Sequence, residues 1–326
     1  MKAAVVKEIG KPPVYGDFRD PVPAKDEVLI QVKAAALSRL TRSKASGKHY
    51  SSTGELPLIP GVDGVGVRAD NGQRVFFMQP PAPFGSMAEK VAVKASHCVP
   101  VPDGLDDVTA AAIANPGMSS MAAFKERARL VTGETVLVNG ATGAAGRLAV
   151  QIAKHLGAKK VIATGRDPET LNKLAAMGAD KTIAITQPKE LLLAAFQQEF
   201  NAGVDVIIDY LWGPTAELLI TAAAQLYGSG REAKPLRYVE VGEVSEPNIT
   251  LPGGALRSTA LELMGSGFGS VPFEKLLGAI SDVLQAALPA RLQVEADVHP
   301  LSEVETVWAN DKNKLRTVFT IGPAAK

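Results

Sequence analysis

Three glycines spaced three residues apart, Gly140, Gly143 and Gly146, form the segment of this chain best suited to bind a phosphate. They follow a short apolar run over 136–138, typical of a strand buried on both faces, and precede apolar residues at helical spacing over 148–157. A turn between a buried strand and a helix points its N–H groups and the positive end of the helix at one spot. The spacing therefore predicts a site for a pyrophosphate.

A second strand, predicted over 161–164, completes a βαβ unit. This context carries the prediction, because three glycines alone are more often an ordinary turn. The turn departs from the GxGxxG pattern, since aligning the last two glycines places Ala141 at the first position. A methyl group is tolerated there if the backbone approaches the ligand less closely. The residues of the turn predicted to bind the dinucleotide are Gly140, Ala141, Thr142, Gly143, Ala144, Ala145 and Gly146.

The residues after the second strand favour NADP(H) over NAD(H). In NAD-binding proteins a carboxylate at this point bonds the ribose 2′-hydroxyl, whereas this chain has Gly165 and Arg166. The nearest acid, Asp167, is followed by proline and glutamate, which is typical of a helix N-cap. The guanidinium of Arg166 can bond a 2′-phosphate through several donors, and Lys173 can add a second positive charge. The alternative for both side chains is a solvated position on the surface.

The composition excludes several other functions. The chain has 326 residues, of which 46% are hydrophobic, and a formal net charge of +1, so it can form two cores but has no excess charge for nucleic acid or an anionic membrane. Its single cysteine, Cys98, excludes an intrachain disulfide and is typical of the reducing cytosol, so we expect a cytoplasmic protein. The first residues lack the apolar core of a signal peptide, and no apolar stretch approaches the length of a membrane span.

The chain divides into two regions by its pattern of elements. Residues 1 to about 115 contain short strand candidates separated by proline and glycine, which indicates a small barrel or sandwich. Helices predicted over 106–114 and 117–127 lead into a second region, from 135 to about 266, in which strands and helices alternate as in a doubly wound parallel sheet. An amphipathic helix over 273–288 and a tail with further strands follow. We expect this tail to return to the first domain.

Four segments carry a resemblance to a known family, namely AAALSRLTRSKASGKHY, LIPGVDGVG, FGSMAEKVAV and VLVNGATGAAGRLAVQIAKHLGA, the last with a downstream GAD. On these segments the chain resembles a zinc-independent member of the medium-chain dehydrogenase/reductase superfamily, close to the NADPH:quinone oxidoreductase group, over nearly its full length. The resemblance implies an α/β fold in which a Rossmann domain, residues 120–267, is inserted into a GroES-like β-rich catalytic domain formed by residues 1–119 and 268–326. It also implies a cleft between the domains and a homodimer formed through Rossmann edge strands.

The positions that bind zinc in other members of the superfamily are changed here. Those members carry a catalytic Cys, a His-Glu pair and a four-Cys lobe, whereas the matching segments read Leu37–Ser38–Arg39 and Gly61–Val62–Asp63, and the lobe is missing from the sequence. Zinc requires three or four N, S or O ligands, and the four histidines are scattered. We therefore predict that no metal is bound. Without a Lewis acid, hydride transfer to an electron-poor acceptor is favoured over alcohol dehydrogenation.

The resemblance also names candidate catalytic residues. In quinone reductase relatives an Asn, an Asp and a Tyr lie near the nicotinamide, and the matching positions here are Ser38, Thr41 and Tyr50. Two of the three therefore depart from the family pattern. Ser38 and Thr41 keep hydroxyls that can donate hydrogen bonds, and Tyr50 either bonds an oxygen of the acceptor or only forms a wall of the pocket.

Further cofactor contacts are implied outside the glycine turn. Ser119 lies before a helix where relatives touch the cofactor phosphate or carboxamide, although it can equally be a hydroxyl at the start of a helix. Val241 and Gly242 end the fifth Rossmann strand, where the relatives' backbone passes the nicotinamide. Gly267 and Phe268 lie at the end of the sixth strand. The glycines of this segment permit the backbone to approach the nicotinamide ring closely.

Asp209 ends the fourth strand, and two roles are open for it. The carboxyl ends of strands are where ligands bind in sheets of this kind. Its carboxylate can also cap the helix that follows.

Together these features predict an NADPH-dependent reductase that transfers hydride to a quinone, so that its partner is a small electrophilic molecule. An enal or enone reductase is an open alternative, because both kinds of acceptor are conjugated electrophiles. A weakly catalytic or non-catalytic NADPH-binding protein, crystallin-like or a redox sensor, is a second alternative, because the Asn and Asp positions are changed.

Overall fold

The structure is a computed structural model that describes residues 1–47, 54–227, 234–310 and 315–322. The chain forms two compact units, one made of residues 1–115 with 283–326 and the other of residues 116–282. We call them the terminal unit and the central unit and describe each by itself. The two boundaries fall inside helices, whereas the sequence-based division placed them at 119/120 and 267/268.

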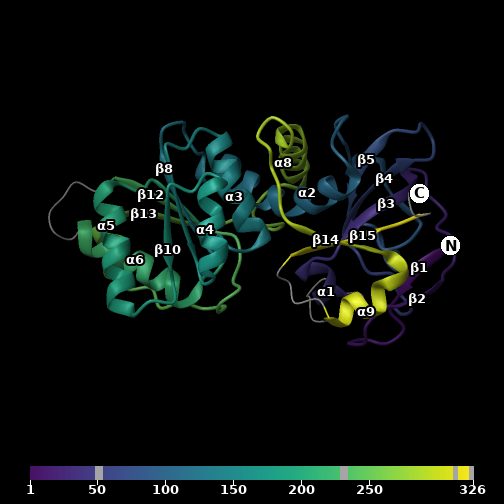
Figure 1. Ribbon diagram of the computed structural model, residues 1–326, viewed down its shortest axis with the longest axis horizontal. Coiled ribbons are helices and arrows are strands. Elements are labelled where there is room, and N and C mark those ends of the chain that lie inside the picture. Colours follow the sequence, from purple (N-terminus) through teal and green to yellow (C-terminus); the bar gives the residue numbers. More distant parts are fainter. Residues whose placement is uncertain (48–53, 228–233, 311–314, 323–326) are drawn as a thin grey trace. The chain divides into compact units, whose positions relative to one another are not determined.

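The central unit contains a six-stranded sheet in which every pair of neighbouring strands is parallel (Figure 1). In spatial order the strands are β10 (Lys181–Ala184), β9 (Lys160–Gly165), β8 (Thr135–Asn139), β11 (Val206–Asp209), β12 (Pro235–Glu240) and β13 (Ala260–Gly265). The predicted α/β fold class with a doubly wound sheet is therefore confirmed. The strand order reverses between β8 and β11, which is the point where ligands bind in open sheets of this kind.

Helices connect these strands, as the parallel pairing requires. They are α3 (Ala144–His155), α4 (Pro168–Ala176), α5 (Lys189–Ala202), α6 (Gly213–Tyr227) and α7 (Gly253–Ser258). Apolar residues of α5 and α6 pack against one face of the sheet, around the buried side chain of Tyr238. Helix α4 begins as its sequence predicts, because the Asp167 carboxylate accepts a hydrogen bond of 2.9 Å from Thr170 N and Pro168 is the first helical residue.

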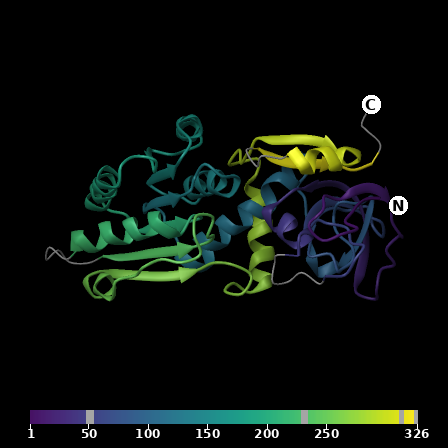
Figure 2. The ribbon, with the colours of Figure 1, turned by 90° about the horizontal axis from the view of Figure 1, so that it is seen from below.

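The terminal unit is β-rich, as predicted. Its larger sheet has the order β14 (Ala296–Pro300), β15 (Arg316–Thr320), β3 (Glu27–Ala36), β4 (Asp63–Arg68), β5 (Arg74–Met78) and β7 (Cys98–Pro100), and β6 (Lys90–Lys94) also pairs with β3. Strand β15 is antiparallel to β3, with Val318 opposite Ala36. The yellow end of the chain therefore lies beside its purple beginning (Figures 1 and 2), and the tail returns to the first domain.

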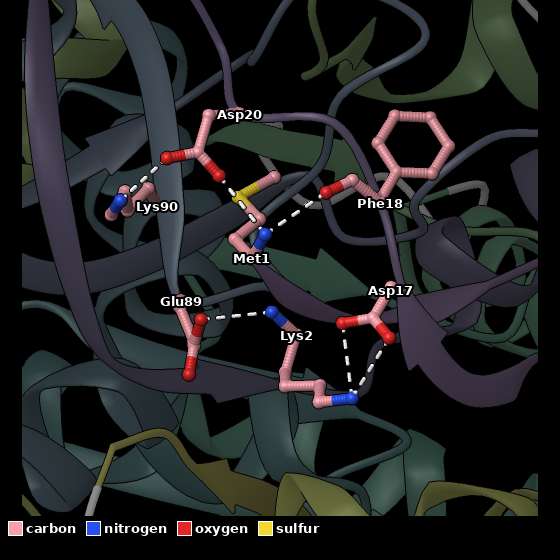
Figure 3. A network of polar contacts seen from close by, with 7 residues as sticks. All are labelled: Met1, Lys2, Asp17, Phe18, Asp20, Glu89 and Lys90. Atoms are coloured by element: carbon pink, nitrogen blue, oxygen red, sulfur yellow. Dashed lines mark hydrogen bonds and ion pairs between the residues drawn. The ribbon is translucent and has the colours of Figure 1, made fainter.

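Smaller elements complete the terminal unit. Strands β1 (Lys2–Val5) and β2 (Val14–Asp17) form an antiparallel pair, and α1 (Arg39–Ala45) and α9 (Val304–Asn310) are short helices. The Met1 ammonium donates to Asp20 Oδ1 at 2.9 Å and to Phe18 O at 3.0 Å, and Lys90 pairs with the same Asp20 carboxylate at 2.6 Å (Figure 3). These contacts join the start of β1 to the residue pair Glu89–Lys90, because Lys2 N also donates to Glu89 Oε2 at 2.8 Å.

Two helices run across the unit boundaries, α2 (Asp107–Ala122) and α8 (Phe273–Ala286). The prediction of two helices separated at Pro116 is wrong, because α2 is continuous and contains this proline. A proline removes one backbone hydrogen bond of a helix, and here the preceding turns, residues 110–114, are fully buried, so packing holds the helix in place. A π-helical segment, Ala123–Ala128, follows directly.

Among the residues that the structure describes, no helix has both the length and the apolar composition needed to cross a bilayer.

Candidate functional site

The glycine turn lies between β8 and α3, and its three glycines are required for different reasons. Gly140 has a φ of +87°, a backbone conformation that residues other than glycine rarely adopt. A methyl at Gly146 would lie 2.4 Å from Gly140 O, so this glycine permits the helix to approach the turn. A methyl at Gly143 would come no closer than 4.0 Å to any other group. The exposed backbone at Gly143 is therefore open to a ligand.

The first turn of α3 completes this part of the site. The first backbone hydrogen bond of the helix runs from Arg147 N to Gly143 O, at 2.9 Å. Gly143 is the N-cap residue and supplies no side-chain hydrogen bond to the first turn. The N–H groups of Ala144, Ala145 and Gly146 thus stand at an uncapped helix N-terminus, where an anion is stabilised. The turn and the helix end together fit the pyrophosphate of a dinucleotide.

Ala141 and Thr142 support the turn from inside. Ala141 is buried, and its N–H donates to Thr164 O at 2.7 Å, so its methyl group belongs to the core of the unit. The Thr142 side chain packs against Gly165, where a methyl would lie 2.3 Å from Thr142 Cγ2. Arg147 adds a bond from its Nε to Thr142 O, at 3.1 Å. This buried arginine was not among the predicted site residues.

The two basic candidates lie beyond the end of β9. Arg166 directly follows the strand and is exposed. Lys173 is exposed on α4, where its Nζ lies 3.2 Å from Glu169 Oε1, a pair one helical turn apart. Asp167 serves as the N-cap of α4. Arg166 is therefore the first charged side chain after β9. The carboxylate of the next residue, Asp167, is already engaged as the N-cap of α4.

A second group of contacts ties α2 to α3 and β11. Ser120 Oγ lies 2.7 Å from the Tyr210 hydroxyl and 3.2 Å from Ala145 O. Burial raises the pKa of the Tyr210 phenol to about 12. The predicted residue Ser119 donates to Pro116 O at 2.8 Å, as a hydroxyl inside a helix commonly does. Ser120 was not among the predicted residues, although Tyr210, directly after a strand, was a signal for a polar contact there.

Buried polar side chains lie in a row where the strands of the central sheet end. Asn139 Nδ2 donates to Asp209 Oδ1 at 2.7 Å, and Tyr238 donates to Asp209 Oδ2 at 2.5 Å. Thr164 Oγ1 donates to Asn139 Oδ1 at 2.7 Å. Burial raises the pKa of the Asp209 carboxyl. Burial also raises the pKa of the neighbouring Glu240, and the charges of Asp209 and Glu243 act in the same direction.

The remaining cofactor candidates follow β12 and β13. Val241 N and Gly242 N both donate to Asp209 O, at 2.8 and 3.2 Å, so these residues lie next to the end of β11. Gly267 and Phe268 lie in an exposed turn after β13, and Phe268 is 42% exposed. Because the strands are parallel, these four residues and the glycine turn lie at the same end of the central sheet.

In the terminal unit the structure brings Ser38 and Thr41 together. Ser38 is the N-cap of α1, and its Oγ accepts a hydrogen bond from Thr41 N at 3.0 Å. The two hydroxyl oxygens lie 2.9 Å apart, and both side chains are buried. Tyr50, the third catalytic candidate, lies outside the described residues.

A buried carboxylate, Asp63, and a partly exposed arginine, Arg316, lie near each other in the same unit. Asp63 is fully buried, accepts a hydrogen bond from Asn115 Nδ2, and lies near Arg316. Burial raises the pKa of the Asp63 carboxyl, and the positive charge of Arg316 opposes this shift. Arg316 also donates to Leu37 O at 3.3 Å, and Leu37 precedes Ser38. Across residues 1–47, 54–227, 234–310 and 315–322, no group of three or more His, Cys, Asp or Glu side chains is placed to hold a metal ion.

Comparisons with known proteins place this geometry in a family. Residues 144–281 match the family model described as zinc-binding dehydrogenase. The chain is 29% identical to a probable NADPH-dependent quinone reductase, tdiC, of Emericella nidulans, over 96% of this chain and 98% of that protein. It is 31% identical to the chloroplastic NADPH-dependent alkenal/one oxidoreductase of Arabidopsis thaliana, over 50% of this chain and 46% of that protein.

A solved structure of similar fold matches nearly the whole chain. The quinone oxidoreductase of Thermus thermophilus is 26% identical, with a TM-score of 0.79 over 98% of this chain and 100% of that one. This likeness extends over the six-stranded parallel sheet and over the β-rich unit formed by the two ends of the chain. The chain belongs to the medium-chain dehydrogenase/reductase superfamily, in its quinone oxidoreductase-like group.

Proposed function

We propose that this protein is an NADPH-dependent reductase that transfers hydride to a quinone. The observation that carries the proposal is the open glycine turn at the uncapped N-terminus of α3, followed at the end of β9 by Arg166 in place of a carboxylate. The relatives from Emericella nidulans and Thermus thermophilus, whose names specify a quinone, support the acceptor.

The central unit holds the cofactor in this proposal. The N–H groups of Ala144, Ala145 and Gly146 bind the pyrophosphate, and the open backbone at Gly143 allows it to approach. Arg166 binds the 2′-phosphate through its guanidinium donors. Asp167 does not replace it as a ribose ligand, because its carboxylate accepts from both the N–H and the hydroxyl of Thr170.

The bound NADPH supplies a hydride for an electron-poor conjugated acceptor. Ser38 and Thr41 then stabilise the negative charge that develops on the acceptor oxygen. Their two hydroxyls share one hydrogen bond, so one of the two protons is used between them and the other is left to donate. Neither hydroxyl is an acid at neutral pH, so these residues orient and stabilise an oxygen. No metal is part of this proposal, because the segments that match the zinc-binding ones of other members read Leu37–Ser38–Arg39 and Gly61–Val62–Asp63, without the Cys and the His-Glu pair.

An enal or enone reductase is the second candidate. The Arabidopsis thaliana relative, whose name specifies an alkenal or enone, matches half of this chain at 31% identity. The same hydroxyl pair would then stabilise an enolate oxygen rather than the oxygen of a reduced quinone.

The test is to follow NADPH absorbance after adding a panel of quinones and, separately, a panel of enals and enones to the purified protein. We expect oxidation by quinones at rates well above those with enones. Faster oxidation by enones would select the second candidate. Tight NADPH binding with no oxidation by either panel would contradict both and favour a non-catalytic nucleotide-binding protein, as expected if Ser38 and Thr41 serve only to cap α1.

A further inference from the structure

The row of buried polar side chains in the central sheet forms a directed chain of hydrogen bonds. Asn139 and Asp209 are the last residues of β8 and β11, Thr164 is the last but one of β9, and all three are fully buried. Each stands two residues beyond a core residue that packs under α5 and α6, namely Ile162, Leu137 and Ile207. Side chains two residues apart on a strand share a face, so the three polar groups lie on the α5 and α6 face of the sheet.

The direction of every bond in this chain is fixed. Gly140 N donates to Thr164 Oγ1 at 3.2 Å, and Thr164 Oγ1 donates to Asn139 Oδ1 at 2.7 Å, because an amide oxygen cannot donate. Asn139 Nδ2 then donates to Asp209 Oδ1 at 2.7 Å. The chain crosses from β8 to β11, where the strand order reverses, and ends on the first glycine of the turn.

Asp209 anchors the chain and also holds a second loop. Its Oδ1 accepts from Leu211 N at 2.8 Å and from Trp212 N at 3.1 Å. Trp212 has a φ of +58°, which is strained for a large side chain and persists only where the surroundings enforce it. The Leu211 side chain lies over Gly140, since a methyl there would be 2.8 Å from Leu211 Cγ. One carboxylate therefore fixes the glycine turn through two separate routes.

These contacts hold the turn from within while its outer side stays free. Thr164 and Leu211 contact the turn at Gly140, whereas the backbone at Gly143 has no close neighbour that a methyl would meet. A polar network that only stabilised the fold would not need to end on the N–H of the phosphate-binding turn. Its position favours a role in fixing the conformation that the ligand meets.

We propose that Thr164, Asn139 and Asp209 are positioning residues that hold the glycine turn in its phosphate-binding conformation. This inference rests on the proposed function, since it takes the ligand of the turn to be a nicotinamide dinucleotide. Without the chain the turn would populate other conformations, and binding would have to restore the competent one. The apparent dissociation constant then rises in inverse proportion to the competent fraction.

The test compares Thr164→Val with Thr164→Ser. Valine has the shape of threonine but leaves Gly140 N and Asn139 Oδ1 without their partner, whereas serine keeps the hydroxyl. We expect Thr164→Val to weaken NADPH binding by about tenfold, the scale of an unpaired buried group, with Thr164→Ser close to the wild type. Binding is measured by NADPH fluorescence at a temperature where thermal melts show each variant to be folded. In turnover, the KM for NADPH should rise and kcat should change little.

A second pair of variants separates positioning from stability. Tyr238→Phe removes only the bond to Asp209 Oδ2, which lies off the route from Asp209 to Gly140. We expect it to lower the melting temperature and leave the NADPH dissociation constant nearly unchanged. In the double variant Thr164→Val/Asp209→Asn, the loss of NADPH binding free energy should be smaller than the sum of the losses in the two single variants. The reason is that both substitutions interrupt the same chain of hydrogen bonds.

The outcomes distinguish this inference from the proposed function. If the wild type binds NADPH and the valine and serine variants bind it equally well, the positioning role is wrong and the proposed function stands. If the wild type prefers NADH, the proposed cofactor is wrong, and the valine–serine contrast measured with NADH still decides the positioning role. A wild type that binds neither dinucleotide overturns both.

Discussion

At the scale of single residues, the glycine turn separates the requirements of folding from those of binding. Gly146 faces backbone atoms of the turn itself, while Gly143 faces open space. A side chain at position 146 would disturb the folded state. A side chain at position 143 would stand in the open space beside the turn, where a bound phosphate is proposed to lie. Two substitutions a few residues apart therefore have different expected consequences.

Gly143→Val is expected to abolish detectable NADPH binding while the protein stays folded, because a β carbon at Gly143 comes no closer than 4.0 Å to another group of the fold. Replacing glycine as the N-cap of α3 should lower the stability by only about 1 kcal/mol. Gly146→Ala is the matched comparison. Its methyl would lie 2.4 Å from Gly140 O, so it should lower the melting temperature. Fluorescence titration and thermal melts on both variants check this. Unchanged NADPH affinity in Gly143→Val would remove the turn from the binding site.

Arg166→Ala is expected to weaken NADPH binding by about 1.5–3 kcal/mol, the scale of a hydrogen bond to a charged group, and to leave NADH binding nearly unchanged. The matched control is Lys159→Ala, which removes an exposed basic side chain just before the other end of β9. Both cofactors are titrated against both variants. Equal losses for NADPH and NADH would contradict a 2′-phosphate contact.

At the scale of elements, α1 shows how a local structural role and a proposed catalytic role can fall on one residue. Ser38 caps the helix through its Oγ and is also a hydroxyl proposed to face the acceptor. Replacing it with alanine removes both contributions at once. Glycine is a much better N-cap than alanine and also lacks the hydroxyl.

Ser38→Ala is therefore expected to lower the free energy of unfolding by about 1 kcal/mol. Ser38→Gly should lower it by only about a few tenths of a kcal/mol. Both should lose turnover of the acceptor if the hydroxyl stabilises the developing charge. Denaturant unfolding and steady-state rates are measured for the two variants. Full activity in Ser38→Gly would assign Ser38 to capping alone.

The elements also show what sequence can and cannot predict. The turn before α3 and the N-cap of α4 were predictable, because their residues are neighbours in the chain and the patterns are local. The bonds among Thr164, Asn139 and Asp209 were not, because they join three strands and depend on the register of the sheet. Helix α1 was not predicted, since it has only seven residues and its first turn has no acidic residue to mark it.

At the scale of the whole molecule, the central unit holds carboxyl groups in surroundings that favour their neutral form. Burial and the charges of Asp209 and Glu243 raise the pKa of Glu240. A carboxyl whose pKa is higher in the folded state binds its proton more tightly there. The stability of the protein therefore falls as the pH rises from below the unfolded pKa to above the folded one.

Glu240→Gln is accordingly expected to raise the melting temperature at about pH 8, where the wild type must hold a charge at this position, and to change it little at about pH 4. The control is Glu262→Gln, an exposed carboxyl on the neighbouring strand β13. Thermal melts across this pH range test the expectation. A gain in stability that is the same at both pH values would contradict it.

The homodimer that the family resemblance implies stays a prediction. Strand β13 is one edge of the described central sheet, and Leu263 on it is 37% exposed. Sedimentation of the protein as purified gives its oligomeric state directly.

The sheet of the terminal unit has a consequence for how the chain is made. Strand β3 leaves the ribosome well before its neighbour β15, because the whole central unit lies between the two strands in the sequence. The central unit, by contrast, is built from one continuous segment and can fold while the ribosome is still adding residues. During synthesis the edge of β3 that β15 will occupy stays unpaired until β15 is made, so this edge is open to pairing with another chain in that interval.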